Sequence, residues 1–366
     1  MLSIIIPVYN GEKYLKETIN NILFSDFRDV EVVAVNDGST DSSIEILEDI
    51  AKKDCRLKIY TKENSGIAES RNYGINKATG EFITFVDQDD VIKCDIFKLL
   101  IEKMKDTKAD MAVCSSARLV DGEEIPLEIQ TDGLYCEKEI LETLIMPIFL
   151  RAYDNPYTDI QNRYFHIWNC LFRTSFLRKH DIKFRAYVNY EDDLLMKIDA
   201  LSHANTVCTI HEIGYQWRIN TKSESFAHHF VDNIGAKQTQ CYEDIKDSLL
   251  HTQIDEEQLR WVTASIYCTH FLDAIQNLVS KEYKKNLRII QKYCEENIYN
   301  RKIDDVAWIN SYAKKGWVRL NVIIPKLIER KGMRAFYCEK IIENLLMVQI
   351  KFKKLMLFEK MIKGKK

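Results

Sequence analysis

Three carboxylates stand together where a short apolar run ends. The run Phe82–Val86 is followed directly by Asp87, Gln88, Asp89 and Asp90. Carboxylates this close repel one another, and a hard divalent cation such as Mn²⁺ or Mg²⁺ relieves the repulsion through oxygen ligands. Such a cation can also bridge the phosphates of a nucleotide and stabilise a leaving diphosphate. A solvated acidic turn that caps the next helix would explain the same residues without a metal, so the neighbouring segments have to decide.

Two other apolar runs also end in polar residues. Leu2–Val8 leads into Tyr9, whose ring can lie flat on a nucleobase. Val30–Val35 leads into a polar turn in which the carboxylate of Asp37 can accept a hydrogen bond from a base N–H. The segment Asn36–Ser39 is also an ordinary turn with a helix cap, so this pattern alone does not identify a site.

A segment that begins with glycine supplies a further group. Gly66 is followed by an amphipathic stretch that carries Arg71. A helix beginning at this glycine would aim amide N–H groups and a guanidinium at phosphate. For Arg71 taken alone, an exposed arginine on an ordinary helix is the alternative.

Alternating strands and helices would position these groups. Continuous apolar strands between amphipathic stretches are typical of an α/β fold, with a mostly parallel sheet flanked by helices. Ligands of such sheets bind beyond the carboxyl ends of the strands, which is where the polar residues above are expected. The predicted strands are Leu2–Val8, Val30–Val35, Leu57–Tyr60, Phe82–Val86 and Met111–Ser115, and the predicted helices are Glu12–Phe24, Ser42–Lys53, Gly66–Ala78, Asp95–Lys105 and Glu137–Leu150.

The second half of the chain has a different texture. Residues 161–225 carry aromatic and charged residues at irregular spacing, which suits a substrate-binding half. After about Ala227 helical periodicity dominates, for example in Gln258–Val279. We therefore expect an α/β domain over residues 1–228 and an all-helical C-terminal domain over residues 229–366.

Composition argues against several classes of protein. The net charge of -3 argues against nucleic-acid binding, which usually requires a strong basic excess. The 10 cysteines lack CxxC spacing, and we expect buried free thiols in a reducing compartment. The first residues show no signal-peptide pattern, and no apolar run reaches the roughly 18 residues of a membrane span. These features predict a cytoplasmic protein.

The last segment is basic and amphipathic. From Lys351 onward, seven lysines interleave with apolar residues against one glutamate, Glu359. A helix of this kind can bind anionic lipid at about 1 kcal/mol per lysine, which would place the protein peripherally on the inner face of the cell membrane. A helix that packs its apolar face on the rest of the domain fits the pattern equally well.

Taken together, the four segments in the first 120 residues resemble the family 2 glycosyltransferases, which have the Rossmann-like GT-A fold. The resemblance is dense over residues 1–120 and thinner to about residue 225. Each motif is weak alone, but four in this order and at this spacing are specific. The matching segments are Ser3–Asn10, Val35–Asp41, Asn64–Asn72 and Gly80–Asp90.

The resemblance implies roles for individual residues. Tyr9 would stack on uracil and Asp37 would bind the base, which implies a UDP-sugar donor. Asp87 and Asp89 would form the DxD pair of the family, with Asp89 as the direct metal ligand and Asp90 able to share that role. The residues expected to bind the donor are Pro7, Tyr9, Asn10, Asp37, Gly66, Arg71, Asp87 and Gln88.

The resemblance also implies a catalytic base in the second half. Glu191-Asp192 resembles the motif that carries the base, although a third carboxylate, Asp193, blurs the register by one. An acceptor hydroxyl must lose its proton as it attacks the anomeric carbon, and a carboxylate within hydrogen-bond reach can take it. Asp192 is the predicted base, and Glu191 would orient it or contact the acceptor. Acidic residues also suit the first turn of a helix, which is the alternative.

A histidine late in the domain is a further candidate ligand. In some GT-A enzymes such a residue completes the metal site, which makes His228 a candidate here. A surface pair formed with His229 is the alternative reading of the same residues.

The predicted function is inverting transfer of a sugar from a UDP-sugar to a glycan or lipid-linked glycan, with Mn²⁺ or Mg²⁺, in the assembly of a surface polysaccharide. A sugar-phosphate nucleotidyltransferase is one alternative. It would be expected to carry a glycine-rich, arginine-bearing loop after the first strand, where this chain has Tyr9–Glu12. A non-catalytic glycan-binding scaffold of the same fold is the other. The sequence leaves the sugar, the acceptor and the oligomeric state open, and a homo-oligomer is compatible with it.

Overall fold

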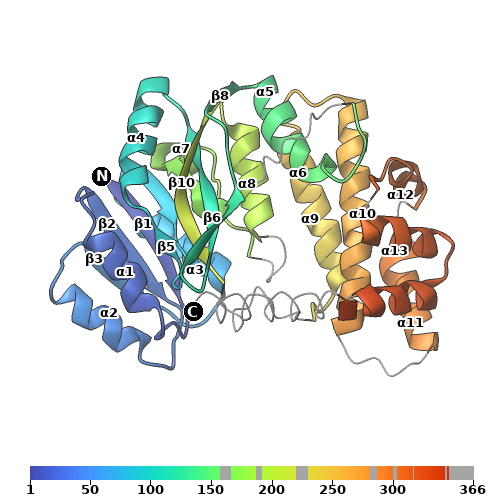
Figure 1. Cartoon of the computed structure of the whole chain (residues 1–366), viewed down its shortest axis with the longest axis horizontal. Coiled ribbons are helices and arrows are strands. Elements are labelled where there is room, and N and C mark those ends of the chain that lie inside the picture. Colours follow the sequence, from blue (N-terminus) through green and yellow to red (C-terminus); the bar gives the residue numbers. More distant parts are fainter. Residues whose placement is uncertain are drawn as a thin grey trace, which may run out of the picture. The chain divides into compact units, whose positions relative to one another are not determined.

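The structure is a computed structural model (Figure 1). The chain divides into two compact units. The first comprises Met1–Arg151, Tyr157–Phe226 and Gln240–Glu256, and the second comprises Ala152–Pro156, Ala227–Thr239 and Glu257–Lys366. The described residues are 1–156, 166–186, 192–219, 230–280, 287–299, 303–315, 317–342 and 344–345.

A ten-stranded sheet forms the centre of the first unit. Its strand order is β3-β2-β1-β4-β9-β6-β10-β5, with β7 paired to β6 and β8 paired to β10. The strands are β1 (Leu2–Val8), β2 (Val30–Asn36), β3 (Leu57–Thr61), β4 (Phe82–Phe85), β5 (Val91–Ile92), β6 (Met111–Val120), β7 (Glu123–Glu128), β8 (Gly133–Cys136), β9 (Cys170–Arg173) and β10 (Thr206–Arg218).

Most of the long strands run in one direction. β3, β2, β1 and β4 are mutually parallel, and β6 is parallel to β10. β9 is antiparallel to both β4 and β6, so β4 and β6 run in the same direction as each other. The predicted mostly parallel sheet is therefore confirmed. β9 is inserted antiparallel between β4 and β6, and the shorter strands β5, β7 and β8 also pair antiparallel with their neighbours.

The apolar runs of the sequence account for the central strands. Every residue of β1 and of β2 is buried, as expected for strands that are covered on both faces. In β1, Ile5 lies between Val33 and Phe85 of the neighbouring strands. The strand-to-helix alternation holds through the first 120 residues with shifts of a few residues at the ends of elements.

The helices of the first unit connect these strands. Since β1 has β2 on one side and β4 on the other, the strand order reverses at β1, and such a reversal is where open α/β sheets bind ligands. The helix α3 packs on β1 and β2. The helices of this unit are α1 (Leu15–Leu23), α2 (Ser43–Ala51), α3 (Ile67–Lys77), α4 (Asp95–Thr107), α5 (Lys138–Ile140), a π-helical turn at Leu141–Ile145, α6 (Met146–Leu150), a 3-10 turn at Ile167–Asn169, α7 (Thr174–Lys179) and α8 (Asp192–His203).

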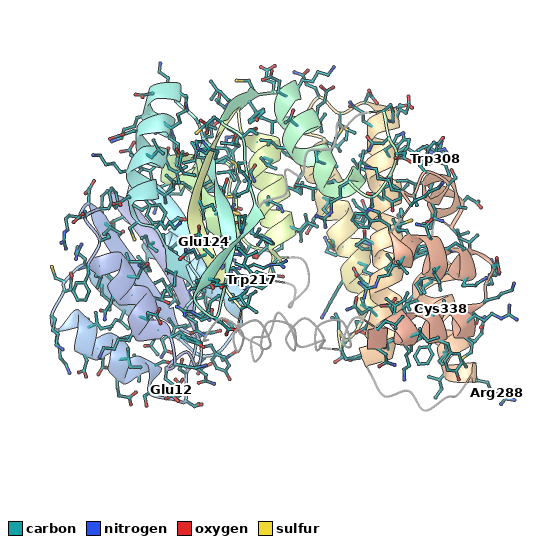
Figure 2. The ribbon with its side chains drawn as sticks, in the orientation of Figure 1. Glu12, Glu124, Trp217, Arg288, Trp308 and Cys338 are labelled. Atoms are coloured by element: carbon teal, nitrogen blue, oxygen red, sulfur yellow. The ribbon has the colours of Figure 1, made fainter. Side chains whose placement is uncertain are left out.

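Helices also make up the described part of the second unit. Trp308, labelled in Figure 2, packs edge to face on Trp261 at 5.0 Å between ring centroids. α9 (Ile234–Leu249) has residues in both units. The other helices are α10 (Glu256–Ser280), α11 (Leu287–Cys294), a π-helical turn at Glu295–Tyr299, α12 (Ile303–Asn310), α13 (Val318–Ile328) and a further helix at residues 332–342.

Two expectations concern residues outside the described ranges. The domain boundary predicted between residues 228 and 229 falls there, and so does the basic tail from Lys351. Both stay predictions. Within the described ranges, none of the helices combines the length and the apolar character needed to cross a membrane.

Candidate active site

The acidic turn, Asp87–Asp90, follows the carboxyl end of β4. Asp87, Gln88 and Asp89 are half-buried, whereas only 1% of Asp90 is exposed. The turn is closed by the backbone N–H of Asp90, which donates to the carbonyl of Asp87 at 3.2 Å. A buried strand therefore delivers three carboxylates to one short turn at the edge of the sheet where ligands of this fold class bind.

Asp90 attaches the acidic turn to β10. Its Oδ2 accepts a hydrogen bond from the Tyr215 hydroxyl at 2.5 Å, and its Oδ1 accepts one from the Arg218 backbone N–H at 2.7 Å. Burial raises the pKa of Asp90 well above its ordinary value, and repulsion from Asp87 and Asp89 raises it further. Because both carboxylate oxygens face β10, Asp90 holds the turn in place.

Tyr215 also contacts the first carboxylate residue of the turn. Its hydroxyl oxygen accepts a hydrogen bond from the Asp87 backbone N–H at 3.2 Å. The Tyr215 ring stacks on Trp168 at 4.2 Å between centroids, and Trp168 stacks on His166 at 4.5 Å. The acidic turn is therefore hydrogen-bonded to the first of three stacked aromatic side chains, Tyr215, Trp168 and His166. Trp168 is only 7% exposed, so its position here is that of a core residue.

Arg71 joins the acidic turn to the start of α8. It is 2% exposed, and its two terminal nitrogens lie 2.9 Å from Asp87 Oδ1 and 2.6 Å from Asp193 Oδ1. Burial opposes the charge of the guanidinium, but the carboxylates of Asp193 and Asp87 outweigh it and raise the pKa of Arg71. The guanidinium also lies 5.1 Å from the centroid of the Phe184 ring. Arg71 thus reaches a carboxylate 122 residues away in the sequence and links it to the acidic turn.

Asp192 directly precedes Asp193 in the sequence, but the two residues differ in exposure. The whole Asp192 residue is 8% exposed, whereas the side chain of Asp193 is 44% exposed. Both belong to the first turn of α8. Glu191 and His228, the other two predicted residues of this half, lie outside the described residues.

The end of β1 presents an aromatic ring held by Gln88. Tyr9 is 45% exposed. Its backbone N–H donates to Gln88 Oε1 at 3.0 Å, and Gln88 Nε2 donates to the Tyr9 carbonyl at 2.9 Å. Gly11 makes room for this pair, because a Cβ at that position would lie 2.2 Å from Gln88 Oε1. In this structure, then, Gln88 positions Tyr9 through its backbone.

The end of β2 is folded around Asp37. This residue is 3% exposed, and its carboxylate accepts hydrogen bonds from the backbone N–H groups of Ser65 at 2.9 Å and Gly66 at 2.8 Å. Lys62 forms an ion pair with the same carboxylate. Gly66 has a φ of 93°, a left-handed conformation that other residues rarely adopt. Asp37 thereby fixes the loop from which α3 begins.

The turns after β1 and β2 are joined by side chains. Asn10 donates its backbone N–H to Ser39 Oγ at 3.1 Å and accepts from the Thr40 backbone N–H at 2.8 Å. Glu12, labelled in Figure 2, accepts from the Ser42 backbone N–H at 3.0 Å. Pro7 is buried within β1, opposite Val35. The structure therefore brings the residues predicted from four separate motifs to one edge of the sheet.

The carboxylates of the acidic turn fit a hard divalent cation. They are anionic oxygen donors on one short turn, which suits Mg²⁺ or Mn²⁺. Burial and the repulsion from Asp87 and Asp89 together raise the pKa of Asp90. Asp87 and Asp89 are half-buried side chains of this turn, so both are reachable from solvent in part.

Sequence comparison gives a consistent family. A family model described as glycosyl transferase family 2 matches residues 3–180. The uncharacterized glycosyltransferase EpsJ of Bacillus subtilis is 28% identical over 225 residues, which cover 61% of this chain and 62% of EpsJ. The glycosyltransferase GlyA of Streptococcus pneumoniae is 40% identical over 112 residues, which cover 31% of this chain and 16% of GlyA. The aligned regions thus span less than two thirds of these relatives.

Structure comparison gives a longer match. The crystal structure of Staphylococcus aureus TarS 1-349 in complex with UDP-GlcNAc has a TM-score of 0.65 at 20% identity, covering 94% of this chain and 91% of that chain. This likeness shows a shared fold and confirms the GT-A expectation. In sequence, TarS, a poly(ribitol-phosphate) beta-N-acetylglucosaminyltransferase, is 27% identical over 233 residues, which cover 63% of this chain and 37% of TarS. Over residues 3–180, the chain belongs to glycosyl transferase family 2.

Proposed function

We propose that this chain is an inverting, metal-dependent hexosyltransferase that moves a sugar from a UDP-sugar to a glycan or lipid-linked glycan acceptor in surface polysaccharide biosynthesis. The observation that carries the proposal is the ion pair of Arg71 with Asp87 and Asp193. It joins the acidic turn to α8, the helix that begins at Asp192. Donor and acceptor groups would have to meet at such a junction.

The nucleotide is proposed to bind across the ends of β1 and β2. The exposed ring of Tyr9 offers a stacking surface for uracil. Asp37 would accept a hydrogen bond from the base, in addition to the three donors that it already binds. Pro7, Asn10, Gly66 and Gln88 would shape this surface through the backbone. TarS, crystallised with UDP-GlcNAc, has the same fold, which supports UDP-GlcNAc as the first donor to test.

Asp89 and Asp87 are proposed to hold Mn²⁺ or Mg²⁺. The bound cation would supply positive charge next to the diphosphate and so stabilise UDP as the leaving group. Arg71 keeps the Asp87 carboxylate in place at 2.9 Å. Asp90, which is hydrogen-bonded to Tyr215 and Arg218, would keep the turn rigid rather than bind the cation directly.

Asp192 is proposed as the base. It would take the proton of the acceptor hydroxyl while the oxygen forms a bond to the anomeric carbon and the bond from that carbon to the UDP oxygen breaks. Attack from the face opposite UDP inverts the anomeric configuration. Asp193 is the less suitable base, because the Arg71 guanidinium already engages its carboxylate at 2.6 Å. Glu191 would orient Asp192, and His228 stays a candidate metal ligand.

The proposed setting is the cytoplasmic side of the membrane. The seven lysines of the segment from Lys351, interleaved with apolar residues, support peripheral binding to anionic lipid. A lipid-linked acceptor would then be presented at the same surface. Removal of residues 351–366 should lower co-sedimentation with anionic vesicles without lowering turnover of a soluble acceptor analogue.

A donor panel tests the proposal. The full chain is incubated with Mn²⁺, each UDP-sugar and a glycan acceptor mixture, and UDP release is measured. We expect one UDP-sugar to give acceptor-dependent UDP release, with the product anomer inverted by NMR. Release of pyrophosphate from UTP and a sugar phosphate, with no transfer from any UDP-sugar, would instead establish a nucleotidyltransferase and contradict the proposal.

A further inference from the structure

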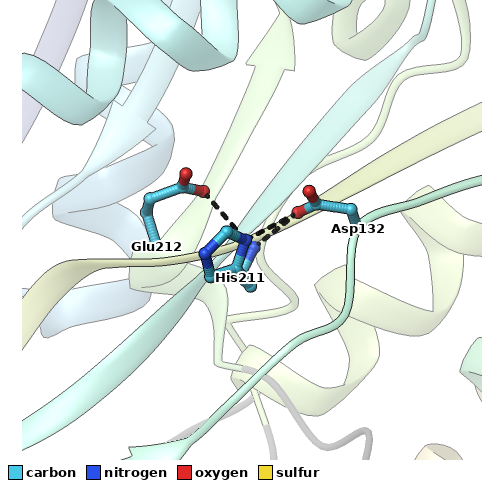
Figure 3. A group of neighbouring side chains, drawn as sticks. All are labelled: Asp132, His211 and Glu212. Carbon is cyan, nitrogen blue, oxygen red and sulfur yellow. Dashed lines mark hydrogen bonds and ion pairs between the residues drawn. The ribbon is translucent and has the colours of Figure 1, made fainter.

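A second group of potential metal ligands lies on the surface of the first unit. It consists of Asp132, which precedes β8, and of His211 and Glu212, which are consecutive on β10. Figure 3 shows the two carboxylates on either side of the His211 ring. We propose that these three side chains, the Asp132 site, bind a divalent cation of borderline softness, with Zn²⁺ as the best fit.

The distances at the Asp132 site suit a small cation. One ligand atom from each residue lies within 4.8 Å of the others. His211 Nδ1 is 3.2 Å from Asp132 Oδ1 and 3.6 Å from Glu212 Oε2. With metal–ligand bonds of about 2.1 Å, these separations correspond to ligand–metal–ligand angles of about 100° and about 120°. Both angles are close to those of a tetrahedral zinc site. The Asp132 and Glu212 oxygens, which lie within 4.8 Å of each other, would have to be within about 4.2 Å to share the cation.

The backbone of β10 is irregular where His211 and Glu212 lie. Consecutive residues of a regular strand point to opposite faces of the sheet. Between Thr209 and Ile213 the register of β10 against β6 shifts, so this rule is broken where His211 and Glu212 lie. The pairing of β8 with β10 begins beside them, at Gly133 and Thr209. The His211 backbone N–H also donates to Asp132 Oδ1 at 2.9 Å. The ligands are thus placed by strands rather than by a free loop.

The chemistry of the ligands separates this site from the acidic turn. One imidazole with two carboxylates is a donor set that suits zinc, whereas oxygen ligands alone suit Mg²⁺ or Mn²⁺. The cation would bind His211 Nδ1, which lies 3.2 Å from Asp132 Oδ1. The side chains are 59%, 62% and 44% exposed for Asp132, His211 and Glu212, which leaves room for water as a further ligand. Hydrogen bonds from His211 lower the pKa of Asp132, and the positive charge of Lys103, which would compete with a cation, lowers it further.

The Asp132 site is also separate in position. His211 precedes Tyr215, the residue that holds the acidic turn, by four positions on β10. At about 3.3 Å per residue, four positions of a strand correspond to about 13 Å, and the register shifts shorten this somewhat. A cation at the Asp132 site would therefore not bridge to a donor diphosphate at the acidic turn.

Zinc titration of the full chain tests the inference. ZnCl₂ is added at pH 7.5 in an isothermal titration calorimeter to the wild type and to His211→Ala, Lys103→Ala and Cys136→Ser. We expect His211→Ala to weaken one binding event at least about tenfold. Lys103→Ala should tighten the same event about twofold, because it removes the competing charge. Cys136→Ser, which removes an exposed thiol on the paired strand β8, should leave it unchanged.

Two results would overturn the inference. The first is a His211→Ala protein that binds zinc with the same stoichiometry and affinity as the wild type. The second is loss of the binding event in Cys136→Ser with His211→Ala unchanged, since the thiol would then be the ligand. Neither result bears on sugar transfer, so this inference and the proposed function can fail separately.

Discussion

Strand β10 connects two groups of carboxylates with opposite surroundings. At its end, Tyr215 and Arg218 hold Asp90 of the acidic turn, which is 1% exposed and has a raised pKa. Near its middle, His211 contacts Asp132, whose side chain is 59% exposed and whose pKa is lowered by hydrogen bonds from His211. Burial and repulsion raise the pKa in the first group, whereas hydrogen bonds lower the pKa in the second.

The difference shows what each group requires. The acidic turn keeps like charges together in a partly buried place, so its geometry depends on the cations and hydroxyls around it. Arg71 and Tyr215 provide these from α3 and β10. The Asp132 site is exposed, and the hydrogen bond from the His211 backbone N–H to Asp132 Oδ1 is present without a metal. Substitutions should therefore affect stability and sugar transfer strongly at the first group and weakly at the second.

The largest effect on stability is expected for Arg71→Leu. It leaves Asp87 and Asp193 without their shared cation, and we expect a loss of about 2–3 kcal/mol, below the value for a fully buried pair because both carboxylates are partly exposed. Urea denaturation measures this loss. Arg71→Lys is the matched control; it keeps the charge but not the fork that reaches two carboxylates, so an intermediate loss is expected. A loss under 0.5 kcal/mol for Arg71→Leu, on the order of a surface substitution, would refute the role of the ion pair.

A smaller effect is expected for Tyr215→Phe. The variant removes the hydroxyl that contacts Asp90 and the Asp87 backbone, and we expect a loss of about 1–2 kcal/mol. The Mn²⁺ concentration for half-maximal binding, followed by electron paramagnetic resonance, should rise several-fold. Tyr60→Phe on β3 is the control, since it removes a tyrosine hydroxyl away from the acidic turn. Equal Mn²⁺ binding by the two variants would argue against Tyr215 as the support of this turn.

Gly11→Ala should cost about 1 kcal/mol and raise the KM for the donor. The new Cβ displaces Gln88, which then loses its hydrogen bonds to the Tyr9 backbone. The cost should largely disappear in a Gln88→Ala background, because nothing is left to displace. A double-mutant cycle in urea measures the coupling, and additive costs would show that Gln88 is not what Gly11 accommodates.

The smallest effect is expected for His211→Ala. Because the residue is 62% exposed and distant from the acidic turn along β10, stability should change by less than about 0.5 kcal/mol. UDP release should stay within about twofold of the wild type. A tenfold fall in UDP release would mean that the two groups of carboxylates are not independent.

The sequence predicted the strands and helices more fully than the contacts between distant segments. β1 was predicted from Leu2 to Val8 and lies there, because a short apolar run that ends in a polar turn is typical of a buried strand. Tyr9, Asp37 and Asp87 follow from the same reasoning, since residues after parallel strands must meet at one edge. Local sequence patterns therefore predict the strands and the residues that follow their ends.

Contacts between distant segments could not be predicted in the same way. Tyr215 reaches Asp90 across 125 residues, and Arg71 reaches Asp193 across 122. Arg71 was expected to face phosphate, whereas the structure pairs it with Asp87 and Asp193. The register shifts that bring His211 and Glu212 together are likewise invisible in a segment whose residues follow no clear period.

UDP release with the preferred UDP-sugar, Mn²⁺ and acceptor tests the central claim most directly. The account predicts that Asp89→Ala and Asp192→Asn each lower kcat by about 10³-fold, whereas His211→Ala keeps most of the activity. Circular dichroism and urea midpoints would verify that the variants are folded. Wild-type turnover in Asp89→Ala and Asp192→Asn would contradict the assignment of metal ligand and base.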